Sequence, residues 1–133
     1  MGTWDAGPFD NDAAADFLSD SGSSPRALAT AFRRCVDADP TEYLDVDDGQ
    51  TVIAAAELVA LGLGYGNLDA VSDEVRSIVR RLGPNEELRL LAIKALPRIR
   101  DRAHSEVASL WAHDPAFDAR LVGLYERLVA AGD

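Results

Sequence analysis

The segment from Val52 to Leu63 constrains the fold most, because it is apolar on almost every side of a helix. A helix of that kind is buried by neighbouring elements on several sides. The run Gly62-Leu-Gly-Tyr-Gly66 follows, and glycine supplies the left-handed backbone that commonly ends a helix. Glu57 is the only charge between Gly49 and Leu68, and a carboxylate near the centre of a membrane span costs about 2.5–3.5 kcal/mol. We therefore predict a central buried helix with a glycine-rich turn, not a membrane span.

Capping residues divide the rest of the chain into further helices, because the apolar residues between them recur every three or four positions. A helix start is predicted wherever Asp, Asn or Ser precedes such a stripe: at residues 10–12, Ser24-Pro25, Asn85 and Asp114-Pro115. The central helix is predicted to begin at Asp47, which forms a capping-box-like pattern with Gln50.

Two longer stripes complete the helical pattern. The residues from Leu68 to Leu82 are predicted to form one helix, and residues 86–112 form a long periodic segment. Pro97 is predicted to kink or break that segment between Ile93 and Pro97, because a proline removes a backbone donor at a cost of about 3 kcal/mol. No segment alternates polar and apolar residues, so no sheet is predicted.

The fold class that follows from these patterns is all-α. A chain of 133 residues can bury one hydrophobic core and is too short for two. Residues 1–133 are therefore predicted to form a single compact bundle of about six helices, built around the central one. Residues 1–12 are predicted to form an ordered loop that packs on this bundle.

The N-terminal loop is predicted to be ordered because it carries two aromatic residues. Trp4 and Phe9 can each bury about 150–250 Å², which would hold the loop against the core. Asp10, Asn11 and Asp12 can then accept hydrogen bonds from unpaired amides at a helix start. Two interpretations stay open: a cap that anchors the first helix, or a preformed loop that presents these three polar residues to a ligand or cation.

The same opening resembles a family of small bacterial proteins known as a domain of unknown function. Members of that family begin Met-Gly-x-Trp-Gly-x-Gly-x-Phe-Asp-Asn-Asp, and Asp5 is where this chain departs from the pattern. The runs Asp48-Gly49-Gln50 and Ala54-Ala55-Ala56-Glu57 are also similar to the family. The residues that match the opening are Met1, Gly2, Trp4, Gly7, Phe9, Asp10, Asn11 and Asp12. The resemblance implies membership of a family without an established activity, some of whose members look similar to immunity-type proteins of bacterial toxin systems.

Glu57 interrupts the apolar central helix, and a buried carboxylate needs a partner. The indole of Trp4, the amides of the N-terminal loop or an arginine could supply that partner. Three interpretations stay open: a structural tether to the N-terminal loop, a solvent-exposed residue, or an acid that binds a ligand or takes part in catalysis.

The acidic residues are unevenly distributed, and this asymmetry bears on the kind of partner. The net charge is −10; residues 1–50 carry 11 acidic residues against 3 arginines, whereas residues 51–133 carry 12 against 10 basic residues. Such a surface repels nucleic-acid backbones and anionic membranes, so we expect neither as the main partner. An acidic N-terminal region that includes Asp45, Asp47 and Asp48 instead favours a basic protein partner.

The leading functional hypothesis is a non-enzymatic protein-binding module, immunity-like or regulatory. The alternative is an enzyme or small-ligand-binding protein that uses Asp10, Asn11, Asp12 and Glu57 in one cleft. A third hypothesis is an acidic protein that imitates a nucleic-acid backbone, which needs carboxylates spaced along an extended surface.

No motif for a metal, a cofactor or a catalytic triad is found, so none is expected. Asp45, Asp47 and Asp48 do not fit an EF-hand loop, because Gln50 stands where that loop needs glycine. Cys35 lies on an apolar stripe and is interpreted as a core thiol rather than a nucleophile. A single cysteine and the lack of a signal-peptide pattern lead us to expect a cytoplasmic protein.

Overall fold

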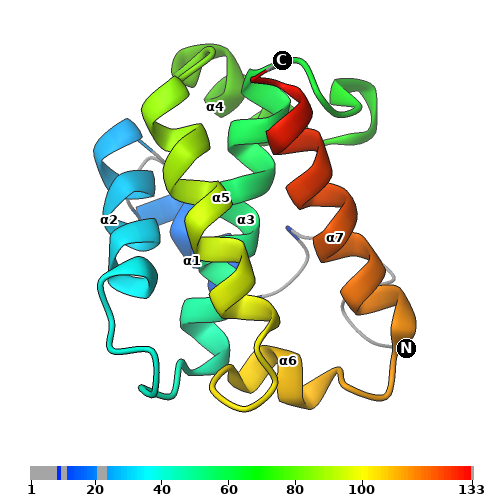
Figure 1. Ribbon diagram of the computed structural model, residues 1–133. Coiled ribbons are helices and arrows are strands. Elements are labelled where there is room, and N and C mark those ends of the chain that lie inside the picture. The colour runs from blue at the N-terminus through cyan, green and yellow to red at the C-terminus, as the bar shows by residue number, and fades with distance from the viewer. Residues whose placement is uncertain (1–8, 10–11, 21–23, 133) are drawn as a thin grey trace.

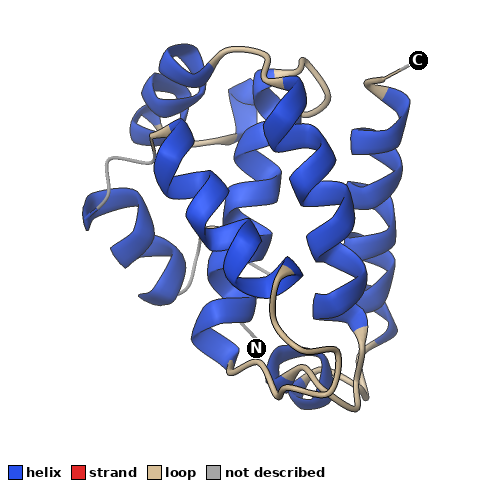
Figure 2. Cartoon of the chain, turned by 60° about the vertical axis from the view of Figure 1, so that its left-hand side comes forward, coloured by secondary structure: helices blue, strands red, loops and turns tan. Residues whose placement is uncertain are grey.

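The chain folds into an all-α bundle, as predicted (Figure 1). The structure is a computed structural model that describes Phe9, residues 12–20 and residues 24–132. Figure 2 shows helices and loops and no strand in this described part. Its elements are α1 (Asp12–Asp20), α2 (Pro25–Val36), α3 (Val46–Gly62), the 3-10 helix η2 (Leu68–Ala70), α4 (Asp73–Leu82), α5 (Glu86–Arg100), α6 (Glu106–Leu110) and α7 (Pro115–Ala130).

Helix α3 is the centre of the bundle, which confirms the prediction from its apolar sequence. It packs against each of the other six α-helices of the described chain. Its residues from Val52 to Ala56 are buried, as are those from Leu58 to Leu61. The largest fully buried side chains around it include Phe32 on α2 and Leu96 on α5. None of the helices in the described residues is long and apolar enough to cross a membrane.

Three predicted helix starts are confirmed by side-chain caps. Ser24 Oγ accepts a hydrogen bond from the Ala27 amide at 3.1 Å, and Pro25 occupies the first turn of α2. Asn85 caps α5 and Asp114 caps α7 in the same way. These caps satisfy amide donors that a helix start leaves unpaired, so the sequence is sufficient to locate them.

The predicted start of α3 is wrong by two residues. The cap is Asp45, whose carboxylate accepts from the Asp48 amide at 2.9 Å, and not Asp47. The Val46 amide is satisfied from outside the helix, by Glu106 Oε1 at 2.7 Å. The start therefore combines a local cap with a contact from a residue 60 positions further along the chain.

Two further predictions about the long stripes are corrected. Leu68 belongs to the separate helix η2, because Ser72 caps a new start for α4 by accepting from the Val75 amide. The predicted break at Pro97 is wrong, because helix α5 continues through Pro97 to Arg100. The alternative, a kink between Ile93 and Pro97, stays a prediction. Pro97 is exposed and lies in the last turn, where the missing donor interrupts little of the helix.

Helix α6 holds the first turn of α3 through a close backbone approach. Leu44, just before α3, forms an isolated bridge with Ser105, just before α6, and is itself buried. A Cβ on Gly49 would lie 2.7 Å from Cγ1 of Val107, closer than real Cβ atoms come. Gly49 is therefore required by tertiary packing although it lies inside a helix.

This packing leads to a stability prediction for Gly49→Ala. In an exposed helix the substitution would stabilise by about 1 kcal/mol. Here the added methyl group overlaps Val107, and overpacking of that kind costs about 1–3 kcal/mol. We expect Gly49→Ala to lower the free energy of unfolding in urea, whereas Gly123→Ala, whose Cβ would meet open space, should not lower it. Equal stability of the two variants would contradict the close α3–α6 contact.

Candidate functional site

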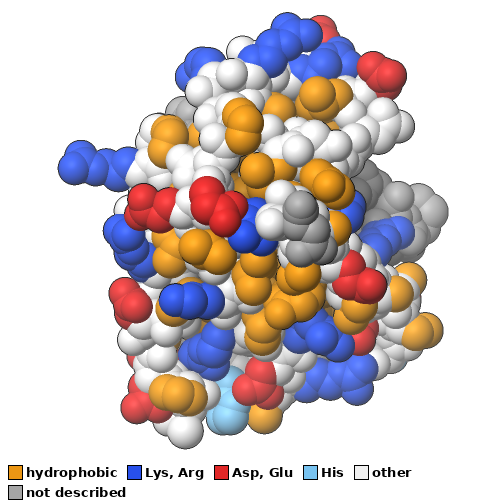
Figure 3. Space-filling view, turned by 45° about the horizontal axis from the view of Figure 1, so that its top comes forward, with side chains coloured by type: hydrophobic (Ala, Val, Ile, Leu, Met, Phe, Trp, Pro, Cys, Tyr) orange, Lys and Arg blue, Asp and Glu red, His pale blue; other side chains and the backbone are white. Residues whose placement is uncertain are grey.

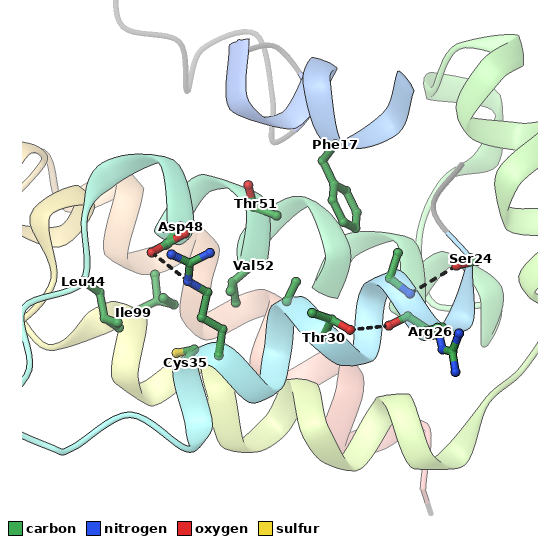
Figure 4. Close-up of a pocket in the computed structure, with 13 residues that line it drawn as sticks. Phe17, Ser24, Arg26, Thr30, Cys35, Leu44, Asp48, Thr51, Val52 and Ile99 are labelled. Carbon is green, nitrogen blue, oxygen red and sulfur yellow. Dashed lines mark hydrogen bonds and ion pairs between the residues drawn. The ribbon is translucent and has the colours of Figure 1, made fainter. Parts of the chain in front are cut away.

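A cavity of about 510 Å³ lies along α2 and α3, beneath α1 (Figure 4). We call it the α2–α3 cavity. Phe17 projects into it from α1, and Ala31 of α2 and Val52 of α3 belong to its apolar lining. Small side chains on α2 leave this space open, because alanine fills little of the gap between two helices. The full lining is Phe17, Ser24, Arg26, Ala27, Thr30, Ala31, Arg34, Cys35, Leu44, Asp48, Thr51, Val52 and Ile99.

Asp48, one of the residues predicted from the sequence, lies at one end of this cavity. Its Oδ2 atom is 3.4 Å from Nε of Arg34, and its side chain is 28% exposed against 71% for Arg34. Burial raises the pKa of the Asp48 carboxyl, and the negative charges of Asp45, Asp47 and Glu42 raise it further, while Arg34 acts in the opposite direction. The ionised carboxylate is therefore held against a desolvated and locally negative environment.

The negative charge comes from residues 37–48, which we call the acidic segment. It contains six carboxylates and no basic residue, and it runs from the end of α2 through the connecting loop into the first turn of α3. In Figure 1 this connection lies at the same end of the bundle as α6, whereas α4 lies at the opposite end. The face seen from the α4 side intersperses acidic, basic and apolar side chains (Figure 3). Six of the 11 acidic residues in positions 1–50 thus lie in one segment at one end of the bundle.

Arg98 of α5 fixes the backbone of the acidic segment. Its guanidinium donates to the carbonyls of Cys35, Asp39 and Pro40 at 3.1–3.4 Å. The pKa of the Asp39 carboxyl is lowered by hydrogen bonds from Thr41 and, to a smaller extent, by Arg98. The segment therefore presents its carboxylates from a backbone that is anchored at several points.

The raised pKa of Asp48 leads to a prediction about pH. Because the folded state favours the neutral carboxyl, ionisation lowers stability as the pH rises from 3.8 through the raised pKa, and the penalty is absent at lower pH. The N-terminus of α3 favours the charge by about 0.3–1 kcal/mol and so reduces this penalty. We expect Asp48→Asn to be more stable than the wild type at about pH 7, with no difference at about pH 3.

Asp118 provides the control of opposite sign. Hydrogen bonds from Arg100 lower the pKa of the Asp118 carboxyl. Its charge therefore stabilises the fold when the pH is above the pKa of this group in the unfolded chain, and this stabilisation is lost as the pH falls through the lowered pKa. Asp118→Asn should therefore lower the melting temperature at neutral pH. An Asp48→Asn variant that is also less stable at neutral pH would show that Asp48 is a stabilising residue.

Glu57, the second acidic residue singled out in the sequence, pairs with Arg127 of α7. Their Oε2 and Nη2 atoms are 2.6 Å apart, and the Glu57 side chain is only 15% exposed. Arg127 also donates to the Tyr65 carbonyl at 2.9 Å, so one guanidinium connects α3, α7 and the turn after α3. The interpretation of Glu57 as a solvent-exposed residue is wrong, and the partner is an arginine, which was one of the three partners considered.

A second cavity of about 460 Å³, the α3–α7 cavity, adjoins this pair. Glu57, Arg120 and Arg127 are its charged lining residues, and Ile53 and Leu124 are among its apolar ones. Asp48 and Glu57 therefore line two different cavities.

The residues of the N-terminal loop are only partly covered by the structure. Phe9 is half-buried and packs against the core, which agrees with its predicted anchoring role. Asp12 is exposed and is the first residue of α1. Trp4, Asp10 and Asn11 lie outside the described residues, so the predicted packing of residues 1–12 and a tether between that loop and Glu57 remain predictions.

Cys35 is a core thiol, as interpreted from the sequence. It is 2% exposed, and burial raises the pKa of its thiol to about 11. A thiol with that pKa is protonated at neutral pH and is a poor nucleophile. In the part of the chain that the structure describes, no group of three or more His, Cys, Asp or Glu side chains is arranged to hold a metal ion.

The sequence interpretation missed the partners of Asp48. The sequence analysis did not pair Arg34 with Asp48, and it did not place Phe17 beside them. Ala27 and Ala31 are the one sequence feature that could have indicated the cavity. They are small residues four positions apart, so they lie on the same face of α2 and leave it shallow.

Comparison with known proteins gives the family but no activity. No curated protein and no solved structure matched the chain. One family model did match, described as a domain of unknown function (DUF4259), and it covers residues 2–120 of the 133. The match includes both Asp48 and Glu57, together with the residues of the N-terminal motif after Met1. The chain therefore belongs to the DUF4259 family.

Proposed function

We propose that this protein is a non-enzymatic binding module, of an immunity-like or regulatory kind, that binds a basic partner protein in the cytoplasm. The acidic segment, residues 37–48, is the surface that makes the contact. The observation that carries the proposal is the concentration of six carboxylates in this one segment at one end of the bundle.

Electrostatics explains why such a surface favours a basic partner. A localised field of one sign steers an oppositely charged protein and raises the rate of association. The anchoring of the segment by Arg98 reduces the ordering that binding requires, because its backbone is already fixed. The raised pKa of Asp48 supports the same interpretation: burial and the neighbouring carboxylates disfavour its charge, and perturbed groups of this kind are common at binding sites.

The test replaces Asp45, Asp47 and Asp48 together by asparagine. Asparagine also caps helices well, so the variant keeps the start of α3. The variant and the wild type are used as baits in extracts of the native cell, and captured proteins are quantified by mass spectrometry. We expect the wild type to enrich a basic protein that the variant loses almost completely, and that low salt favours.

The matched control neutralises Asp69, Asp73 and Glu74, which are exposed residues near the start of α4. It removes the same number of charges from the other end of the bundle and should retain the partner. Unchanged capture of every protein by the Asp45, Asp47 and Asp48 variant would contradict the proposal. Equal loss in both variants would show that only net charge matters, which also contradicts it.

A small-ligand site is the second candidate function, and one observation favours it. The carboxylate of Glu57 is largely buried beside a cavity that also contains Arg120 and Arg127. Arg127 already satisfies Glu57, so the pair is explained without a ligand. A metabolite that raises the melting temperature of the wild type but not of Glu57→Gln would favour this candidate over protein binding.

A further inference from the structure

The α2–α3 cavity combines an apolar wall with a carboxylate at one end. Phe17, Ala31 and Val52 supply apolar surface from three different helices. The volume of about 510 Å³ falls within the range of cavities that bind small groups. A bulky aliphatic side chain that is buried in such a cavity contributes more binding free energy than the same side chain contributes on an exposed surface.

The carboxylate at that end retains capacity for a further cation. Arg34 approaches Asp48 at 3.4 Å, which is longer than the 2.7–2.9 Å of a strong charge-assisted hydrogen bond. The Arg34 side chain is 71% exposed, so this pair is weak and can rearrange at little cost. A second cation at Asp48 would be attracted by the acidic residues beside it.

The charge around the cavity defines the direction of a bound segment. The acidic segment borders the Asp48 end, whereas Arg26 lines the opposite end beside Ser24 (Figure 4). A basic residue of the partner is therefore favoured at Asp48 and disfavoured near Arg26. An acidic chain such as this one is a poor occupant, because its own charge would be repelled by the acidic segment.

We propose that the α2–α3 cavity receives a bulky aliphatic side chain of the basic partner protein, while Asp48 binds a lysine or arginine of the same segment. This inference rests on the proposed function and adds to it the chemistry of the segment that is recognised: an apolar residue next to a basic one.

Two short synthetic peptides test the inference on the full chain. One consists of leucine and lysine, and the other has serine in place of every leucine and so carries the same charge. Binding of each fluorescein-labelled peptide is measured by anisotropy. We expect the leucine peptide to bind about tenfold more tightly than the serine peptide, the ratio that corresponds to partial burial of one leucine side chain.

Three variants locate the binding. Ala31→Phe fills the cavity, so it should reduce the affinity of the leucine peptide to that of the serine peptide. Thr51→Trp blocks the cavity from α3 and serves the same purpose if Ala31→Phe does not fold, as judged by circular dichroism. Asp48→Asn should weaken the leucine peptide by about fivefold, and Asp47→Asn, the matched control on the same turn, by less than about twofold.

The outcomes separate this inference from the proposed function. If both peptides bind equally and the cavity variants change nothing, binding is due to surface charge alone: the inference is wrong and the proposed function stands. If neither peptide binds the wild type, the inference is wrong, and the capture experiment with the Asp45, Asp47 and Asp48 variant decides the proposed function separately. Binding of the leucine peptide that Asp47→Asn weakens as much as Asp48→Asn would exclude the specific role of Asp48.

Discussion

Replacing Arg89 by methionine is expected to lower the free energy of unfolding by about 3 kcal/mol. Arg89 lies on α5, and its side chain is 10% exposed. Its Nη1 atom donates to the Leu128 carbonyl at 2.9 Å, and its other nitrogens bind both oxygens of Glu86. The Leu128 carbonyl lies in the last turn of α7, where carbonyl groups have no amide partner within the helix. Methionine fills a similar volume but leaves that carbonyl without its donor.

The position of the charge adds to this effect. A cation at the C-terminus of a helix is favoured by the helix dipole, by about 0.3–1 kcal/mol at an exposed site. Arg89→Lys keeps the charge but loses the planar guanidinium group, so its free energy of unfolding should lie between those of Arg89→Met and the wild type. The pKa of Glu86, which Arg89 holds below its usual range, should rise toward the ordinary value in the methionine variant. Urea unfolding measures the first effect, and equal stability of Arg89→Met and the wild type would contradict it.

Replacing Arg127 by methionine should also be strongly destabilising, by about 2–4 kcal/mol. The change removes the cation that pairs with Glu57 and leaves a largely buried carboxylate. It also removes the donor to Tyr65, which holds the turn after α3. We expect Glu57→Gln to cost less, because the amide oxygen can still accept a hydrogen bond from Arg127.

The double variant Glu57→Leu with Arg127→Met is the decisive control. Removing both charges avoids the unpaired carboxylate, so the double variant should be more stable than Arg127→Met alone. If the destabilisation of the double variant equals the sum of the destabilisations of Glu57→Leu and Arg127→Met, then Glu57 and Arg127 act independently. An unchanged melting temperature of Glu57→Gln would count against a tether between Glu57 and the N-terminal loop.

The helices of this fold could largely be predicted because their ends are local. Ser24-Pro25, Asn85 and Asp114-Pro115 each bring a capping group to amides two or three residues away, and the sequence contains both partners. The start of α3 was placed two residues late, because Asp45 and not Asp47 supplies the cap. Glu106, far away in sequence, adds a bond to the Val46 amide. Pro97 was expected to kink or break its helix. The helix does not break there, because Pro97 lies where the helix is about to end.

The candidate site was less predictable, because it depends on pairs of residues far apart in the chain. Glu57 was recognised as a carboxylate that needs a partner, but its partner Arg127 is 70 residues away and is one of 12 arginines. Asp48 was recognised through a family resemblance and a charge pattern. The cavity beside it arises only when α1 places Phe17 against α2 and α3.

The most direct test of the proposed binding surface is hydrogen exchange of the full chain with and without the basic protein that it captures. Binding through the acidic segment predicts slower exchange of amides in residues 37–48 and in the part of α2 that lines the α2–α3 cavity. Amides in α4 and α7 should be unchanged. Protection confined to α4 and α7, with residues 37–48 exchanging as before, would contradict the proposal.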